Sequence, residues 1–326
     1  MTSPFYLVYP PVSNQEAEWV TKDPAVARLL RSSDLYMIAM RAEATFTRPI
    51  SQGSVLRMGI TADDTLTNDE FDLDCTTLAE NVFGVGNAPD TIDIRYDDEK
   101  NKLIKLFANE TPDNINSGRA RPFEWFTTEK LIFDVGRRKP GIHGFTRHRE
   151  FATYKLLYVG IAKKTDTYQR LFKSAHHKRQ QILGNEYPIR STSRVTDEMF
   201  LFAWATDPVV LRTIENEDDL VDSHNQDWDA HYRAVIADAE KAFVHLLNPE
   251  YNTVKFENYP QGKDGLSSYG YAGYSFVLAE NITFQGSTQS MYGGWLGIAN
   301  LPSKDADIIV TTGDTVQLYK GLGSQS

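Results

Sequence analysis

A tyrosine, an arginine and a glutamate in the middle of the sequence have the chemistry that phosphodiester hydrolysis requires. Arg170 lies twelve residues after Tyr158, and Glu240 lies on a stretch with helical spacing of apolar residues. A carboxylate can hold one hard divalent cation, Mg²⁺ or Mn²⁺, and such a cation acts as a Lewis acid on phosphate oxygens. A guanidinium stays charged and offers phosphate a planar fork of donors. Glu240 could therefore hold a metal and Arg170 could bind phosphate, although Glu240 taken alone is more typical of a surface carboxylate on an amphipathic helix.

Short motifs surround these residues at separate places in the chain. A Gly-Ile-His run ends at His143, and a Tyr-Val-Gly run begins at Tyr158. In this order, with a helical arginine after the second motif, the chain resembles the GIY-YIG endonuclease family over residues 139–256. The residues after the glutamate are the most specific part of this resemblance, because the family places Pro, Tyr and Asn nine, eleven and twelve residues beyond its catalytic Glu. Here those positions, counted from Glu240, are Pro249, Tyr251 and Asn252.

The resemblance implies roles for five residues. Tyr158 would be the general base, and Asn252 would hydrogen-bond within the site and fix its geometry. His143 stands where the family has its first tyrosine, and we expect it on the strand beside Tyr158. A free tyrosine has a pKa of about 10, so a histidine with a pKa of about 6.5 could relay its proton. The implied catalytic set is His143, Tyr158, Arg170, Glu240 and Asn252.

The charge distribution favours a nucleic-acid partner, although the formal net charge is −10. Residues 129–195 contain 15 Lys and Arg against 5 Asp and Glu, whereas both flanking stretches are acidic. Such a basic band is typical of polyanion binding, and the alternative is a solvated lysine-rich face. We expect DNA rather than RNA. The residues predicted to contact backbone phosphates are Lys163, Lys164, Lys173, His176, His177, Lys178 and Arg179.

The elements that must position these residues can be predicted from hydrophobic spacing. Residues 141–148, 154–161 and 199–205 indicate three strands, the last of them buried on both faces. Helical spacing predicts a helix over 167–183 and another from Trp228 to Leu246, which must end before Pro249. Apolar residues also recur at helical spacing over 25–46, ahead of shorter strand-like pieces.

These elements predict an α+β fold with a central, small three-stranded antiparallel sheet flanked by helices, as in the GIY-YIG family. An Asn-, Gly- and Pro-rich stretch over 109–122 is a plausible domain boundary. We predict an N-terminal α+β domain over 1–128, a nuclease domain over 129–256 and a β-rich C-terminal region over 257–326.

Composition excludes several classes of protein. The chain has 326 residues, 41% of them hydrophobic and 24% charged, which excludes wholesale disorder and fibrous repeats. A single cysteine, Cys75, excludes an intrachain disulfide framework and a cysteine-rich zinc site. No apolar run is long enough to cross a membrane, and the first residues do not have the pattern of a secretion signal. We therefore expect a cytoplasmic protein without a membrane partner, and a homo-oligomer remains open.

The functional hypothesis is a metal-dependent endonuclease, with a role in restriction or in defence against mobile elements suggested by analogy alone. The presence of His143 in place of a tyrosine favours a first alternative, a non-catalytic nucleic-acid-binding or regulatory protein on a degenerate nuclease scaffold. A structural or interaction protein that uses its β-rich C-terminal region is the second alternative.

Overall fold

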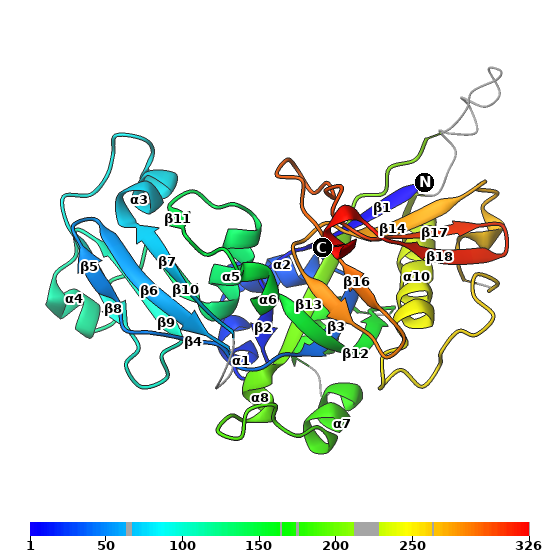
Figure 1. Cartoon of the computed structure of the whole chain (residues 1–326), viewed down its shortest axis with the longest axis horizontal. Helices are drawn as coiled ribbons and strands as arrows, with labels where there is room; N and C mark the ends of the chain where they lie inside the picture. The colour runs from blue at the N-terminus through cyan, green and yellow to red at the C-terminus, as the bar shows by residue number, and fades with distance from the viewer. Residues whose placement is uncertain (63–66, 164, 174–175, 212–227, 263, 326) are drawn as a thin grey trace. The chain divides into compact units, whose positions relative to one another are not determined.

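The computed structural model describes residues 1–62, 67–163, 165–173, 176–211, 228–262 and 264–325. The chain forms two compact units, each made of strands and helices (Figure 1). Unit 1 contains Met1–Arg41, Thr153–Tyr187 and Val195–Ser326, and unit 2 contains Ala42–Ala152 and Pro188–Arg194. The general α+β prediction is confirmed. The units divide the chain differently from the three consecutive domains predicted, because unit 1 draws on three separate stretches.

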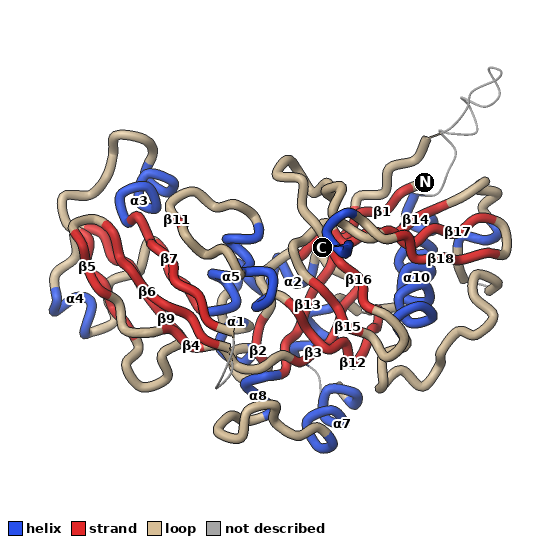
Figure 2. Tube along the Cα trace, viewed as in Figure 1, coloured by secondary structure: helices blue, strands red, loops and turns tan. Residues whose placement is uncertain are grey.

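Unit 1 is built on one ten-stranded mixed sheet, and helices make up the rest of its regular structure (Figure 2). The order is β16-β15-β12-β3-β13-β1-β14-β17-β18, with β2 paired to β13. The strands are β1 (Thr2–Leu7), β2 (Val12–Ser13), β3 (Leu35–Met40), β12 (Thr153–Ile161), β13 (Met199–Thr206), β14 (Tyr274–Leu278), β15 (Thr283–Gln285), β16 (Ser290–Tyr292), β17 (Ile308–Thr312) and β18 (Thr315–Tyr319).

The helical elements of unit 1 differ greatly in length. The segment predicted as one helix over 167–183 contains the π-helical turn η1 and most of the helix α7, and residues 174 and 175 lie outside the described residues. The elements are α1 (Ala17–Val20), α2 (Pro24–Arg31), η1 (Tyr168–Lys173), α7 (His177–Asn185), α8 (Val195–Glu198), α10 (Trp228–Leu247), η2 (Leu266–Ser268) and η3 (Leu322–Gln325).

The strand β3 lies at the centre of this sheet, between β12 and β13. All six of its residues, Leu35–Met40, are buried, so the strand is apolar on both faces. It pairs antiparallel with both neighbours, which are the strands predicted over 154–161 and 199–205. The helix expected over 25–46 is wrong in its second half, because a strand buried on both faces loses the alternation that marks a strand in sequence. The predicted small three-stranded sheet is replaced by this larger one.

The long helix α10 forms as its spacing predicts, from Trp228 to Leu247. Its apolar side packs into the core of unit 1, where Phe243 contacts Phe5 of β1 edge-on with ring centroids 5.7 Å apart. The helix ends at Asn248, whose φ of 50° places it in the left-handed region, and Pro249 follows. Asparagine tolerates this conformation at a helix end, and proline cannot continue the helix.

Unit 2 contains two smaller antiparallel sheets, of five strands and three strands. The helices of unit 2 are short, with at most nine residues each. The strands are β4 (Thr45–Phe46), β5 (Ile50–Gln52), β6 (Val55–Thr61), β7 (Asn68–Asp74), β8 (Ile92–Tyr96), β9 (Leu103–Ala108), β10 (Glu124–Thr127) and β11 (Ile142–His143). The helices are α3 (Cys75–Phe83), α4 (Pro112–Asn116), α5 (Thr128–Gly136) and α6 (His148–Phe151).

The strand with His143 belongs to unit 2 and pairs with β7, where Ile142 lies opposite Leu73 and His143 opposite Asp72. The expected pairing of this strand with the Tyr158 strand is therefore wrong. The strand is only two residues long, because Gly141 and Gly144 have φ values of 90° and 83° and turn the chain on either side of it.

No helix in the described part of the chain is both long enough and apolar enough to cross a membrane.

Candidate active site

Two tyrosines lie side by side on one face of the unit 1 sheet. Tyr36 of β3 is directly opposite Gly160 of β12, and Tyr158 is opposite Ile38 in the same pair of strands. Residues two apart on a strand share a face, so Tyr36 and Tyr158 project from the same face. Their ring centroids are 6.1 Å apart. Tyr36 is fully buried and Tyr158 is half-buried.

Gly160 makes room for this pair of rings. A Cβ atom at this position would lie 2.6 Å from Cε1 of Tyr158 and 2.8 Å from both Cζ and Oη of Tyr36. Both side chains are held by their neighbours, so neither can move away without disturbing the site. The glycine of the Tyr-Val-Gly motif is therefore required by the close approach of the two tyrosines.

Arg170 reaches the tyrosines from the π-helical turn η1. Its Nε donates a hydrogen bond to the Tyr36 hydroxyl at 2.7 Å, and its side chain is partly exposed. Single π-helical turns are uncommon and frequently occur at functional sites. Nearby Tyr36, Tyr158 and Glu240 all help to raise the pKa of Arg170 against the effect of burial, so the guanidinium is charged. The arrangement presents a fixed positive charge beside the two phenol groups.

His176 also holds Tyr36, and the structure settles its tautomer. The backbone N–H of Arg179 donates to Nδ1 of His176 at 3.1 Å, so Nδ1 carries no proton. Burial and the charge of Arg170 lower the pKa of His176 to about 4, so the ring is neutral and its proton is on Nε2. Nε2 lies 2.9 Å from the Tyr36 hydroxyl and donates to it. His176, which the sequence predicted to contact backbone phosphates, is only 8% exposed and caps the start of α7.

The hydroxyl of Tyr36 therefore accepts two hydrogen bonds, from Arg170 and from His176. Its own proton must point to a third group, and its hydrogen bonding with Tyr158 acts to lower the pKa of Tyr158. Burial and the charge of Glu240 act in the opposite direction and leave the pKa of Tyr158 raised. Burial also raises the pKa of Tyr36, which keeps its proton. Tyr36 and Arg170 thus favour the ionised form of Tyr158, whereas burial and Glu240 oppose it more strongly.

Glu240 supplies the carboxylate of this site. It projects from α10, is half-buried, and lies within electrostatic range of both Tyr158 and Arg170. Burial raises its pKa to about 7, although the charges of Lys163 and Arg170 oppose the rise. No hydrogen bond or ion pair joins Glu240 to another residue that the structure describes. It is a partly desolvated carboxylate without a protein partner among these residues.

Asn252 fixes the strand beside Tyr158. Its Oδ1 accepts from the backbone N–H of Val159 at 2.9 Å, and its Nδ2 donates to the Val159 carbonyl at 2.8 Å. The side-chain amide thus takes both backbone groups that a neighbouring strand would pair. The pairing of β12 with β3 shifts register between Leu156 and Tyr158, so this is where β12 requires additional support.

A pair of lysines and an aspartate flank Glu240. Lys163 binds Asp264 at 3.0 Å, and Lys241 of α10 binds the other oxygen of the same carboxylate. Both lysines hold the pKa of Asp264 down, at about 2, together with their hydrogen bonds. This bridge ties the end of β12 to α10 next to Glu240.

The other residues predicted to bind phosphate have different surroundings. Lys173 and His177 are exposed, and Lys178 is half-buried beside Gln181. Arg179 donates to the Leu171 carbonyl and to Asn14, so its guanidinium holds α7 in place. Lys164 lies outside the described residues.

The site fits a single hard cation. Across the described ranges, no three His, Cys, Asp or Glu side chains gather into a multi-ligand metal centre. A half-exposed carboxylate that burial has destabilised is nevertheless suited to one divalent cation that keeps most of its waters. Glu240 is the residue that would hold it.

Tyr36 is the functional residue that the sequence-based prediction missed, and it occupies the position expected for His143. A signal for it exists in the sequence. Ser32 and Ser33 interrupt the helical spacing, and the six apolar residues that follow have the length of a buried strand. Tyr158, Arg170, Glu240 and Asn252 come together in unit 1, whereas His143 belongs to unit 2.

No protein-family model, curated protein or solved structure matches the chain.

Proposed function

We propose that this protein is a metal-dependent endonuclease that hydrolyses phosphodiester bonds of nucleic acid, DNA in preference to RNA. One observation carries the proposal: two tyrosines, an arginine and an unpartnered carboxylate from separate stretches of the chain meet in unit 1. Phosphodiester hydrolysis needs an activated water, a positive charge at the phosphate and assistance to the leaving oxygen.

Each residue has a task in this chemistry. Tyr158 would act as its phenolate, which takes the proton of the attacking water and becomes a neutral phenol, and the proton of Tyr36 would stabilise that phenolate before the transfer. Arg170 binds the phosphate while its Nε keeps Tyr36 in place. His176 is a positioning residue, since its Nε2–H orients the hydroxyl of Tyr36. A divalent cation held by Glu240 would supply Lewis acidity at the phosphate.

The arrangement also weighs against the first alternative, a degenerate scaffold. That alternative is favoured by a histidine in place of the first tyrosine. The strand next to Tyr158 carries Tyr36, so both tyrosines of the GIY-YIG pattern have counterparts in unit 1. This supports the resemblance to that family as part of the proposal.

The test is cleavage of a fluorescently labelled plasmid or duplex with and without Mg²⁺ or Mn²⁺. We expect cutting that requires the metal and that Glu240→Gln reduces about a thousand-fold, the scale on which losing a key electrostatic group acts. Glu250→Gln is the matched control, because Glu250 is an exposed carboxylate just beyond the same helix. Binding of DNA without cutting under every condition, or equal cutting by both variants, would refute the proposal.

A further inference from the structure

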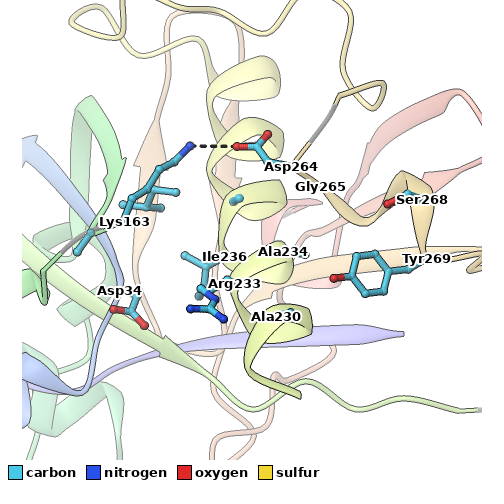
Figure 3. A pocket seen from close by; sticks show the side chains of 13 residues that line it. Asp34, Lys163, Ala230, Arg233, Ala234, Ile236, Asp264, Gly265, Ser268 and Tyr269 are labelled. Atoms are coloured by element: carbon cyan, nitrogen blue, oxygen red, sulfur yellow. Dashed lines mark hydrogen bonds and ion pairs between the residues drawn. The ribbon is translucent and has the colours of Figure 1, made fainter. Parts of the chain in front are cut away.

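A cavity of about 550 Å³ adjoins the candidate active site in unit 1. Its size lies in the range of pockets that take a small molecule or one nucleoside. Part of the wall is apolar, formed by Ile161, Ala162, Ala234 and Ala237, and the polar groups stand at separate places around it. Figure 3 shows Asp34 and Lys163 on one side of α10 and Ser268 and Tyr269 on the other.

Two elements that carry groups of the candidate active site, β12 and α10, also line this cavity, and a third lining residue, Asp34, directly precedes β3. Asp34 is two residues before Tyr36, and its carbonyl accepts from the backbone N–H of Ala162 at 2.9 Å, which extends the pairing of β3 with β12. On α10, Ala230, Ala234 and Ala237 form a stripe at helical spacing that continues to Glu240. Ala237 and Glu240 are about 4.5 Å apart along the axis, at the helical rise of 1.5 Å per residue. The cavity therefore lies along α10 directly next to the candidate active site.

The cavity has two opposite charges that do not pair with each other. No hydrogen bond or ion pair connects the carboxylate of Asp34 or the guanidinium of Arg233 to any residue within the described ranges. Both groups are drawn on the same side of the cavity (Figure 3). At the end nearer Glu240, Lys163 and Lys241 are both paired with Asp264. Asp34 and Arg233 are thus available to a ligand that has donors and acceptors on one edge.

We propose that this cavity binds an unpaired guanine base next to the phosphodiester that the active site cleaves, an inference that rests on the proposed function. Guanine has two adjacent donors, N1–H and the N2 amino group, that match a carboxylate. Its O6 and N7 acceptors match an arginine, the most common specific contact to this base. None of cytosine, adenine, thymine and uracil has both a pair of adjacent donors and a pair of adjacent acceptors. Enzymes that act on nucleic acid read unstacked bases in pockets of this kind.

The other polar lining groups lie in different directions from Asp34. Ser268 and Tyr269 stand across α10 from it (Figure 3), away from the side on which the base and its phosphate would bind. Lys163 lies at the end toward Arg170 and Glu240, the direction in which the phosphate must extend. A base in the cavity would thereby fix which phosphodiester lies over Tyr158.

Calorimetric titration of the full chain with guanosine 5′-monophosphate (GMP) tests this without any cleavage. We expect GMP to bind at least ten-fold more tightly than the monophosphates of adenosine, cytidine or uridine. Asp34→Asn should weaken GMP binding about ten- to hundred-fold, the effect of losing one bidentate base contact. Asp229→Asn, at an exposed carboxylate in the first turn of α10, should leave it within about two-fold. Equal binding of the four nucleotides, or equal effects of the two variants, would overturn the proposal.

Two further variants keep the result interpretable. Ala230→Phe places a ring in the cavity from a partly exposed position, and it should abolish GMP binding with an unchanged thermal midpoint. Glu240→Gln should bind GMP as the unmodified chain does. If the GMP pattern appears but no metal-dependent cutting does, the base site stands and the endonuclease proposal fails. If cutting depends on Glu240 but GMP shows no preference, the base site fails and the endonuclease proposal stands.

Discussion

Each unit holds a cluster of charged side chains, and the two clusters differ in how their charges are balanced. In unit 2, Glu124 and Asp134 are 7% and 8% exposed, and two lysines bridge them. Lys130 binds the two carboxylates at 3.0 and 2.6 Å, and Lys139 binds both as well. The lysines hold the pKa of Glu124 below its usual value although burial acts to raise it.

In unit 1, Glu240 is less buried than Glu124 but has no such partner among the residues that the structure describes. Its pKa is raised instead of lowered. Lys163 and Lys241, the nearest candidates, are bound to Asp264. The comparison teaches that burial alone does not indicate function. A charge that the fold neutralises is structural, whereas a charge that the fold leaves destabilised is free to bind a ligand.

The largest expected effect is on stability in unit 2. Glu124→Gln leaves two ammonium groups beside one carboxylate in a buried place, and breaking a buried pair costs about 3–5 kcal/mol. Urea unfolding followed by circular dichroism measures this loss. Glu99→Gln, at an exposed position of the same unit, is the control. A change below about 0.5 kcal/mol would show that the cluster is not structural.

In unit 1, Glu240→Gln should increase the stability of the chain instead of lowering it. The usual pKa of this carboxyl group is 4.5, and the folded chain raises it to about 7. At pH values between these two, the folded chain holds a proton at Glu240 that the unfolded chain has lost. Stability therefore falls as pH rises through this range, and Glu240→Gln should remove the loss. We expect the variant to be more stable by about 1–2 kcal/mol at pH 8, after allowance for partial exposure, and by less at pH 5.5. Thermal unfolding at both pH values checks this, and a less stable variant at pH 8 would contradict the comparison.

Removing a neighbouring positive charge should change the pKa of Glu240 with little effect on the free energy of unfolding. Lys163 lowers the pKa of Glu240, and its pair with Asp264 is largely exposed. Lys163→Gln should raise the acid midpoint of the cleavage profile by about 0.5 pH units. It should change the free energy of unfolding by less than about 1 kcal/mol. An unchanged midpoint would mean that protonation of Glu240 is not the cause of the loss of cleavage at acid pH.

The smallest effect is expected at Lys173, an exposed lysine of η1 whose ammonium lies 5.8 Å from the centre of the Tyr168 ring. Lys173→Gln should weaken DNA binding uniformly across sequences. It should also make the slope of the logarithm of the binding constant against the logarithm of the salt concentration shallower by about 1. It should leave the pH midpoint unchanged, which makes it the control for Lys163→Gln. Fluorescence anisotropy over a salt series measures the slope, and a change in sequence preference would argue against a phosphate contact.

Much of unit 1 could be predicted from local patterns. The strands predicted over 154–161 and 199–205 are confirmed as β12 and β13, and the helix with Glu240 begins at Trp228 and ends before Pro249. The two predictions that failed are connected. Because residues 35–40 are apolar throughout, their helical spacing concealed a strand. The resemblance instead predicted that the Gly-Ile-His strand, with His143, pairs with β12.

The sequence by itself determined the chemistry that is available: the phenol of Tyr158, the guanidinium of Arg170 and the carboxylate of Glu240 on a helix that proline must end. Only the tertiary structure decided that Tyr36 is the partner of Tyr158. The reason is physical, because strand pairing joins backbone groups far apart in the chain and leaves no local periodicity. Burial is likewise a property of the fold, so the raised pKa of Glu240 and the buried place of His176 appear only when the elements are packed together.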